Sequence, residues 1–156
     1  MFQTIVLALD GSTSSDLALE CAAEIARESG GQIHVVHVVE IMVGRAAGPA
    51  NPAEADIKEK IRQQVADLVG SGIKADLEFH SATLGGPAAI IAETADRVDA
   101  NAIVCGTRGH TLIGGMLLGS VPLRLLHIAK CPVMVVPVTF KARSATRARS
   151  AAAAAG

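Results

Sequence analysis

Five short apolar runs alternate with four stretches of helical periodicity, and this alternation limits the chain to very few folds. The apolar runs cover residues 4–9, 33–39, 74–81, 102–105 and 132–138. Strands buried on both faces have this nearly continuous apolar character, which is typical of a parallel sheet covered by helices. The run at 74–81 alternates more between polar and apolar residues and is expected near an edge of the sheet.

The segments between these runs carry apolar residues at helical spacing. The first helix is expected between an N-cap at Ser14 or Ser15 and a stop at Gly30. Three further helices are expected over 53–69, 87–98 and 120–130. The resulting order, strand and helix in strict alternation, predicts an open α/β sheet with right-handed crossovers.

Length and composition predict one domain without a nucleic-acid partner. The chain has 156 residues, no Trp or Tyr and three Phe, so it lacks the aromatic platforms that stack single-stranded bases. Residues 1–138 hold 10 basic and 15 acidic residues, and this acidic body argues against DNA binding. Residues 139–156 hold four basic residues and no acid; this Ala/Ser-rich tail is expected to be disordered, outside a single domain at 1–138.

The cysteines and the absence of a long apolar run predict a cytoplasmic protein. The chain has three cysteines, Cys21, Cys105 and Cys131, and their spacing matches no zinc site. Because their number is odd and each lies in an apolar run, they are expected to be buried thiols of a protein in a reducing compartment. The N-terminus has no charged leader, and no apolar run approaches 18 residues. Membrane partners are therefore not expected.

Two loops stand where an open α/β sheet binds ligands, beyond the carboxyl ends of its strands. The first, LDGSTSS at 9–15, places Asp10 directly after a buried run. A carboxylate there is suited to a sugar hydroxyl or a metal ion. The alternative is structural, with Asp10 or a following serine capping the next helix.

The second loop, GTRGHTLIGGMLLGS at 106–120, places glycines between a strand and a helix start. Unpaired N–H groups at a helix N-terminus suit an anion, and glycine lets a phosphate approach the backbone. The alternative is that the glycines only relieve steric crowding, with Ser120 as N-cap. The loop has neither the Walker pattern nor the dinucleotide fingerprint.

The spacing Gly106-x2-Gly109-x9-Gly119-Ser120 resembles the nucleotide-binding signature of the universal stress protein family. The resemblance extends over residues 2–138. Its further elements, in chain order, are IVLALDGS, HVVHVVE, AIVCGTRG, LLGSV and CPVMVVPV. It implies an open five-stranded parallel sheet in the order 3-2-1-4-5 with helices on both faces, which brings the two loops side by side. It also implies ATP, or a related adenine nucleotide, as ligand.

Residue roles follow from the resemblance alone. Asp10 would lie near the ribose and a Mg²⁺ or Mn²⁺ ion that accompanies the phosphates. Val38 would line the adenine pocket, and Cys105 and Gly106 would lie near the base and ribose. The phosphates would be held by Gly109, Gly119, Ser120 and Val121. Pro122 departs slightly from the pattern, because it removes one N–H at the helix start.

The expected function is a stress-response or signalling switch that binds ATP. No lysine clamp or evident base accompanies the loops, so slow ATP hydrolysis is the most that is expected and no catalytic residue is assigned. The last run would form an apolar sheet edge, and family members pair through it, so a homodimer through residues 133–138 is expected, besides an unknown protein partner. Three alternatives stay open: a dimerising interaction module that never uses nucleotide, a binder of AMP or a cyclic nucleotide, and a slow ATPase.

Overall fold

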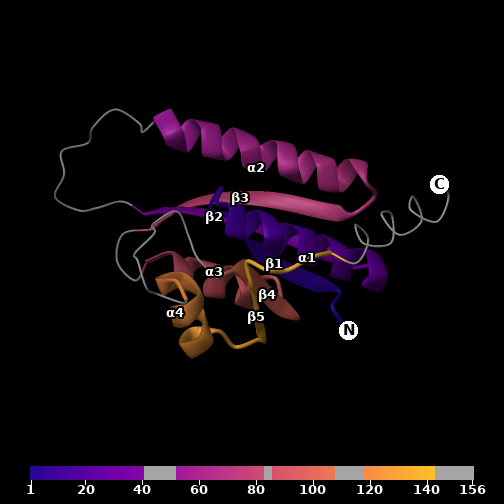
Figure 1. Cartoon of the computed structure of the whole chain (residues 1–156). Helices are drawn as coiled ribbons and strands as arrows, with labels where there is room; N and C mark the ends of the chain where they lie inside the picture. Colours follow the sequence, from indigo (N-terminus) through magenta and orange to yellow (C-terminus); the bar gives the residue numbers. More distant parts are fainter. Residues whose placement is uncertain (41–51, 83–85, 108–117, 143–156) are drawn as a thin grey trace.

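The computed structural model describes residues 1–40, 52–82, 86–107 and 118–142 (Figure 1). Strands and helices alternate along the chain as the sequence predicts. The strands are β1 (Thr4–Ala8), β2 (Gln32–Glu40), β3 (Lys74–Ala82), β4 (Ala102–Gly106) and β5 (Val133–Val136). The helices are α1 (Thr13–Ser29), α2 (Pro52–Gly70), α3 (Gly86–Arg97) and α4 (Ser120–Ile128).

The five strands form one parallel sheet in the order β3-β2-β1-β4-β5, which confirms the predicted fold. β1 lies at the centre, with three buried residues between two half-buried ones. β3 is an edge strand, as its alternating pattern predicts, and it pairs with β2 over its whole length from Lys74 to Ala82. β5 forms the opposite edge.

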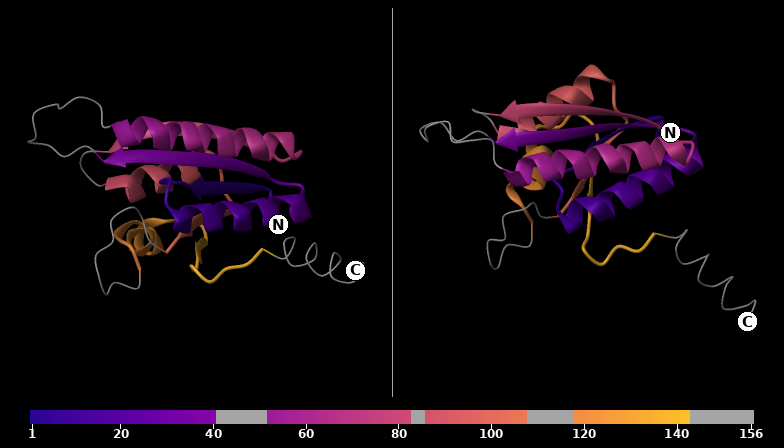
Figure 2. Two further views of the ribbon diagram at one scale, coloured as in Figure 1. Left: turned by 45° about the horizontal axis from the view of Figure 1, so that its top comes forward. Right: turned by 90° about the horizontal axis from the view of Figure 1, so that it is seen from above.

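The helices cover the two faces of the sheet in pairs, and each pair encloses its own core (Figure 2). α1 and α2 cover one face, where the core includes Ile5, Leu7, Ile33, Val35 and Ile61. α3 and α4 cover the other, where the core includes Val6, Val36, Ile91, Ile103 and Leu125. Alternate residues of β1 and β2 therefore point into different cores.

The ends of α1 are set by local hydrogen bonds. Ser12, in an extended conformation, is the N-cap, and its Oγ accepts from the N–H of Ser15 at 3.2 Å. The prediction of Ser14 or Ser15 was wrong, because both are helical and buried. Gly30 ends the helix with a left-handed φ of 67°, as its sequence position predicts.

Small residues bring α1 close to the sheet. Its fully buried positions include Ala18, Ala22 and Ala26, whereas the larger Leu17 and Cys21 are only half-buried beside them. At the start of the helix, a Cβ on Gly106 would lie 2.6 Å from the backbone oxygen of Ser14. The end of β4 therefore requires glycine for helix packing, independently of any ligand.

The cysteines only partly match the prediction of buried thiols. All three are unpaired, and Cys105 is buried while Cys21 and Cys131 are half-buried. Burial raises the pKa of the Cys105 thiol to about 12, so this side chain stays neutral over the physiological range. Burial also raises the pKa values of Cys21 and Cys131.

The packed body continues beyond residue 138. Phe140 packs against the core beneath α1, and Ala142 is buried. The sequence predicts disorder over 139–156; the structure describes residues 139–142, and 143–156 lie outside the described residues. Among the described helices, none is both long and apolar enough to cross a membrane.

Replacing Gly106 by Ala is expected to lower the free energy of unfolding by about 1–3 kcal/mol, because the new methyl overlaps the backbone of α1. Denaturant unfolding measures this change. Gly70→Ala is the matched control, because no atom lies within 4 Å of its Cβ position. That variant should keep its stability or gain up to about 1 kcal/mol. Equal stability of the two variants would contradict the proposed overlap.

Thiol labelling should separate the cysteines. In the folded protein at pH 8, Cys21 and Cys131 should react with a maleimide while Cys105 stays unlabelled, because Cys105 is buried whereas the other two are half-buried. Denaturation should expose all three. Peptide mass spectrometry after timed labelling identifies the site, and early modification of Cys105 would show that the end of β4 opens in the native state.

Candidate functional site

The candidate site lies where the carboxyl ends of β1 and β4 meet (Figure 1). These neighbouring strands lead into the two loops that the sequence singles out. The hydroxyls of Ser14, in the first turn of α1, and Thr107, just after β4, lie 3.4 Å apart. The structure thus brings together the Asp10 loop, the end of β4 and the start of α4.

Asp10 has one carboxylate oxygen engaged within its own loop. Its Oδ1 accepts from the backbone N–H of Ser12 at 3.0 Å and from Ser12 Oγ at 2.5 Å. Its Oδ2 has no donor among the described residues. Asp10 therefore has the structural role that the sequence leaves open, because it supports the N-cap of α1. Its role towards a ribose hydroxyl or a metal ion stays a prediction.

The start of α4 presents backbone donors. Gly119 is the N-cap without a side-chain cap, so the alternative of Ser120 as N-cap is wrong. The N–H of Gly119 donates to the carbonyl of Thr107 at 2.7 Å, which joins the two ends of the 108–118 segment. The N–H groups of Ser120 and Val121 find no acceptor in the described part of the chain, as is typical of a first helical turn.

The other predicted residues occupy different environments. Val38 is half-buried near the end of β2 and packs against the core beneath α3 and α4. Cys105 lies within the same core at 3% exposure, so its side chain is shielded from solvent and from any ligand at the surface. Gly106 contacts Ser14 of α1. Gly109 lies outside the described residues.

Further residues of the site escape prediction from sequence. Ser14 and Thr107 join the two loops, and neither belongs to the glycine pattern. His37 and Lys60 hydrogen-bond to the carbonyls of Leu9 and Gly11, which flank Asp10. Lys60 lies far from the loop in sequence, and only the docking of α2 brings it there. The histidine in the run HVVHVVE was the one available signal.

A metal ion would have to be shared with a ligand. Over the described ranges, no three His, Cys, Asp or Glu side chains gather in a way that could hold an ion. Asp10 supplies a single carboxylate at this site. A divalent cation bound there would therefore need phosphate oxygens and water to complete its coordination.

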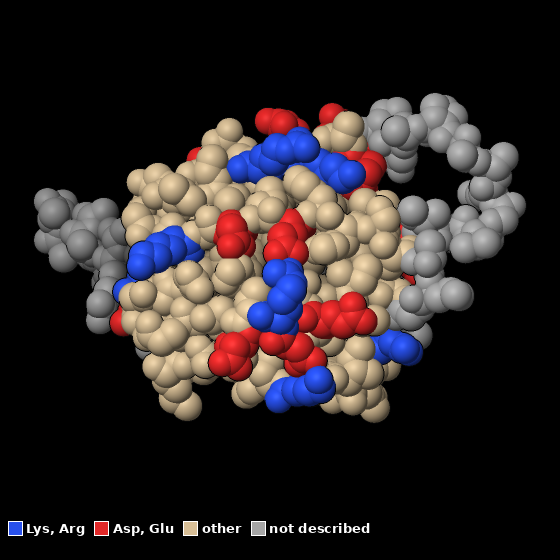
Figure 3. Space-filling view, turned by 180° about the vertical axis from the view of Figure 1, so that it is seen from behind, with Lys and Arg blue, Asp and Glu red and all other residues tan. Residues whose placement is uncertain are grey.

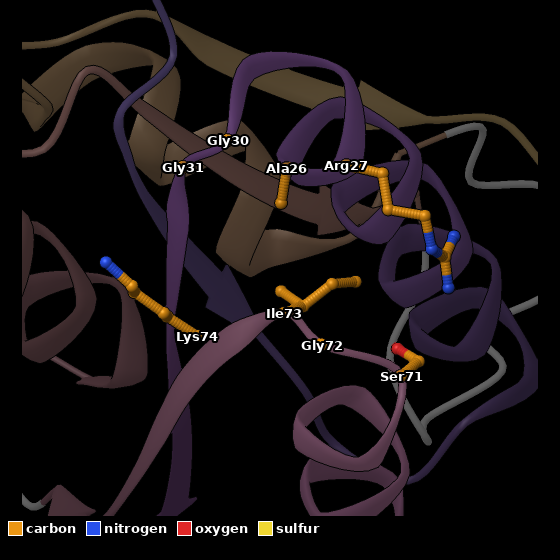
Figure 4. Close-up of a pocket in the computed structure, with 8 residues that line it drawn as sticks. All are labelled: Ala26, Arg27, Gly30, Gly31, Ser71, Gly72, Ile73 and Lys74. Carbon is orange, nitrogen blue, oxygen red and sulfur yellow. The ribbon is translucent and has the colours of Figure 1, made fainter.

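A shallow pocket of about 220 Å³ lies at the opposite end of the sheet (Figure 4). Its walls come from the end of α1 and from the turn between α2 and β3, including Arg27, Gly31, Ser71 and Lys74. Two helices end here, and helix C-termini disfavour anions. The pocket therefore does not offer what the start of α4 offers to a phosphate.

Acidic and basic side chains are interspersed on the face seen from behind in Figure 3. Elsewhere in the described chain, charged side chains form pairs, among them Arg97 with Glu78 at 2.6 Å and Lys130 with Asp96 at 2.6 Å. The Arg97 guanidinium and the His80 ring, both hydrogen-bonded to Glu78, lower the pKa of its carboxyl. This face shows no continuous basic stripe of the kind that tracks a phosphate backbone.

Known relatives share most of the chain. Universal stress protein MJ0531 of Methanocaldococcus jannaschii is 33% identical over 140 residues, which cover 87% of this chain and 82% of that protein. A universal stress protein solved in complex with cAMP is 30% identical, with a TM-score of 0.62 over 88% of this chain and 98% of that one. The universal stress protein of Archaeoglobus fulgidus, solved in complex with dAMP, is 27% identical, with a TM-score of 0.64 over 87% and 99%.

The family assignment rests on nearly the whole described fold. The model of the universal stress protein family matches residues 1–137, from just before β1 to just past β5. The strand order and the paired helices are those that the resemblance implies. The chain therefore belongs to the universal stress protein family.

Proposed function

We propose that this protein binds an adenine nucleotide, ATP in particular, between the Asp10 loop and the start of α4, and acts as a stress-response or signalling switch. The observation that carries the proposal is the Ser14–Thr107 contact, because Ser14 lies in the helix that follows the Asp10 loop and the Thr107 carbonyl accepts from Gly119 at the start of α4. One side offers a carboxylate oxygen and the other offers unpaired backbone donors. A nucleotide has a ribose and a phosphate chain that match these two groups.

The phosphates bind at the start of α4. The N–H groups of Ser120 and Val121, the Ser120 hydroxyl and the helix dipole all favour an anion there. The segment that contains Gly109 supplies further backbone contacts in this proposal. Hydrogen bonds to charged groups contribute about 1.5–3 kcal/mol each. A few of them, set against the entropy lost on association, give micromolar affinity, about −8 kcal/mol.

The base and the cation contact the remaining groups of the site. The adenine lies towards Val38 and the backbone at Cys105 and Gly106, and Asp10 Oδ2 receives a ribose hydroxyl or a Mg²⁺ or Mn²⁺ ion bound to the phosphates. AMP and cyclic nucleotides are the second candidates. Relatives solved with cAMP and dAMP favour them, as does Pro122, which limits the donors available to a long phosphate chain.

Turnover is at most slow ATP hydrolysis in this proposal. Fast phosphoryl transfer needs a positioned water or acceptor and cations that neutralise developing charge. Asp10 is the one carboxylate in the described part of the site, and its Oδ1 is engaged with Ser12. The site therefore suits binding better than catalysis.

The protein is proposed to pair with a second copy through β5. This strand is a sheet edge, and its residues Val133, Met134 and Val135 are only half-buried. Large apolar side chains are exposed nearby: Leu126 at 54% on α4 and Val138 at 58% just after β5. Edge pairing would satisfy the open backbone groups of β5 and would cover this apolar surface. A protein partner that reads the nucleotide state is proposed as well.

Titration calorimetry with ATP, AMP and cyclic AMP, with and without Mg²⁺, tests the binding proposal. Micromolar ATP affinity is expected, at about 10⁻⁶ M. Asp10→Asn should weaken ATP binding in the presence of Mg²⁺ by about tenfold, because it removes a charged ligand of the ion. Asp67→Asn, on the exposed side of α2, is the matched control. Folded protein that binds none of the three would contradict the proposal and favour the nucleotide-independent interaction module.

Light scattering after size-exclusion chromatography tests the dimer. The wild type should elute as a dimer and Val138→Asp as a monomer, because a charge would have to be buried in the interface. Val69→Asp is the control, since Val69 is exposed to a similar degree, 53%, on α2. A monomeric wild type at micromolar concentration would overturn this part of the proposal.

A further inference from the structure

The two carbonyls on either side of Asp10 are both held by side chains that α2 anchors. His37 Nδ1 lies 2.8 Å from the carbonyl oxygen of Leu9, and Lys60 Nζ lies 3.0 Å from that of Gly11. Within the part of the chain that the structure describes, Asp10 itself makes no hydrogen bond to α2; only the carbonyls of its two neighbours do. The direction in which its carboxylate points therefore depends on how a distant helix docks.

The contact through His37 is buried and has three partners. His37 is 3% exposed and packs edge-on against Phe79 with ring centroids 5.9 Å apart. Its Nε2 lies 2.7 Å from Glu54 Oε1, in the first turn of α2. Because a carbonyl can only accept, the ring donates from Nδ1 to Leu9. Glu54 fixes the ring orientation in the way that a second partner orients a metal-bound or catalytic histidine.

The contact through Lys60 is more exposed, and the Lys60 ammonium group bonds a second residue besides Gly11. Lys60 Nζ also lies 2.8 Å from Asp16 Oδ2, in the first turn of α1. Gln64, one turn later on α2, donates to the other oxygen of Asp16 at 2.8 Å. Gly11 has a left-handed φ of 81°, a conformation that glycine adopts without strain. This loop conformation places its carbonyl within reach of α2.

We propose that α2 is the positioning element of the nucleotide site and that Glu54 and Lys60 are its positioning residues. Glu54 acts through His37 on the Leu9 carbonyl, and Lys60 acts directly on the Gly11 carbonyl. Together they hold the Leu9–Gly11 backbone so that Asp10 presents its Oδ2 to the ligand. Neither residue touches the ligand. The effect on affinity rests on the proposed function, whereas the effect on the loop exists in the ligand-free protein. Any change that shifts α2 on the sheet changes the site.

The test compares Lys60→Met with Arg62→Met, two variants of α2 that each remove one positive charge. Arg62 pairs with Glu59 and lies over Phe79. Both proteins should keep near-wild-type stability, because exposed ion pairs contribute little. In Lys60→Met, the Ser12 amide, which donates to Asp10, should exchange its hydrogen about three to ten times faster, as expected for the loss of one charge-assisted contact. Arg62→Met should leave that rate unchanged.

Binding of AMP and of uncharged adenosine separates positioning from simple charge attraction. If Lys60 acts by holding the Asp10 loop, Lys60→Met should weaken both ligands by about the same factor, three- to tenfold. If it acts as a cation near phosphate, only AMP should bind more weakly, and the inference would fail.

A second pair of variants tests the His37 contact. Glu54→Ala should raise the hydrogen-exchange rate of the Ser12 amide, as Lys60→Met does. Glu54→Gln should keep the wild-type rate, because its side-chain amide still hydrogen-bonds to His37 Nε2. Wild-type exchange in both Lys60→Met and Glu54→Ala would overturn the inference. A wild type that binds no nucleotide would instead contradict the proposed function. The hydrogen-exchange comparison would then still decide whether α2 positions the Asp10 loop.

Discussion

The site depends on the close approach of α1 to the end of β4. The Ser14 backbone lies where a side chain on residue 106 would begin, so helix and strand meet only because that residue is glycine. This contact places the Asp10 loop, which leads into α1, against the residues that follow β4. The glycine thus acts first on packing, and the gathering of polar groups at the candidate site is its consequence.

The candidate site also lies across the boundary between two cores. The Asp10 loop leads into α1, which with α2 encloses one core, whereas the donors at Ser120 and Val121 belong to α4 on the other face. A ligand that contacts both would link the two helical layers across the sheet. The candidate site at the carboxyl ends of β1 and β4 therefore touches elements of both layers rather than one.

Much of the fold was predictable from the sequence, because alternation of buried strands and helices permits few arrangements. The run at 74–81 and the stop at Gly30 were correct for the physical reasons given. The N-cap of α1 was not, because four consecutive Ser and Thr residues have similar capping ability and only the backbone conformation at Ser12 selects one. The placement of α1 on its alanines likewise depends on how closely the sheet lets it approach.

The candidate site was predictable only in part. Asp10, Gly106 and the start of α4 stand out because strand ends and glycines are visible in the letters. Ser14 and Thr107 are visible as polar residues of the two loops, but the sequence does not show that their hydroxyls meet. Lys60 likewise acts on Gly11 across 49 positions. Contacts of that kind arise from tertiary docking, which local patterns do not encode.

The hydrogen bond between Thr107 and Gly119 has a consequence for how this family can diversify. It closes the 108–118 segment at its base, so the helix start keeps its place whatever chain connects the two residues. The entropy of closing such a connection changes slowly with its length, by about 0.6 kcal/mol per doubling. A connection of different length or composition is therefore compatible with the same scaffold beneath it.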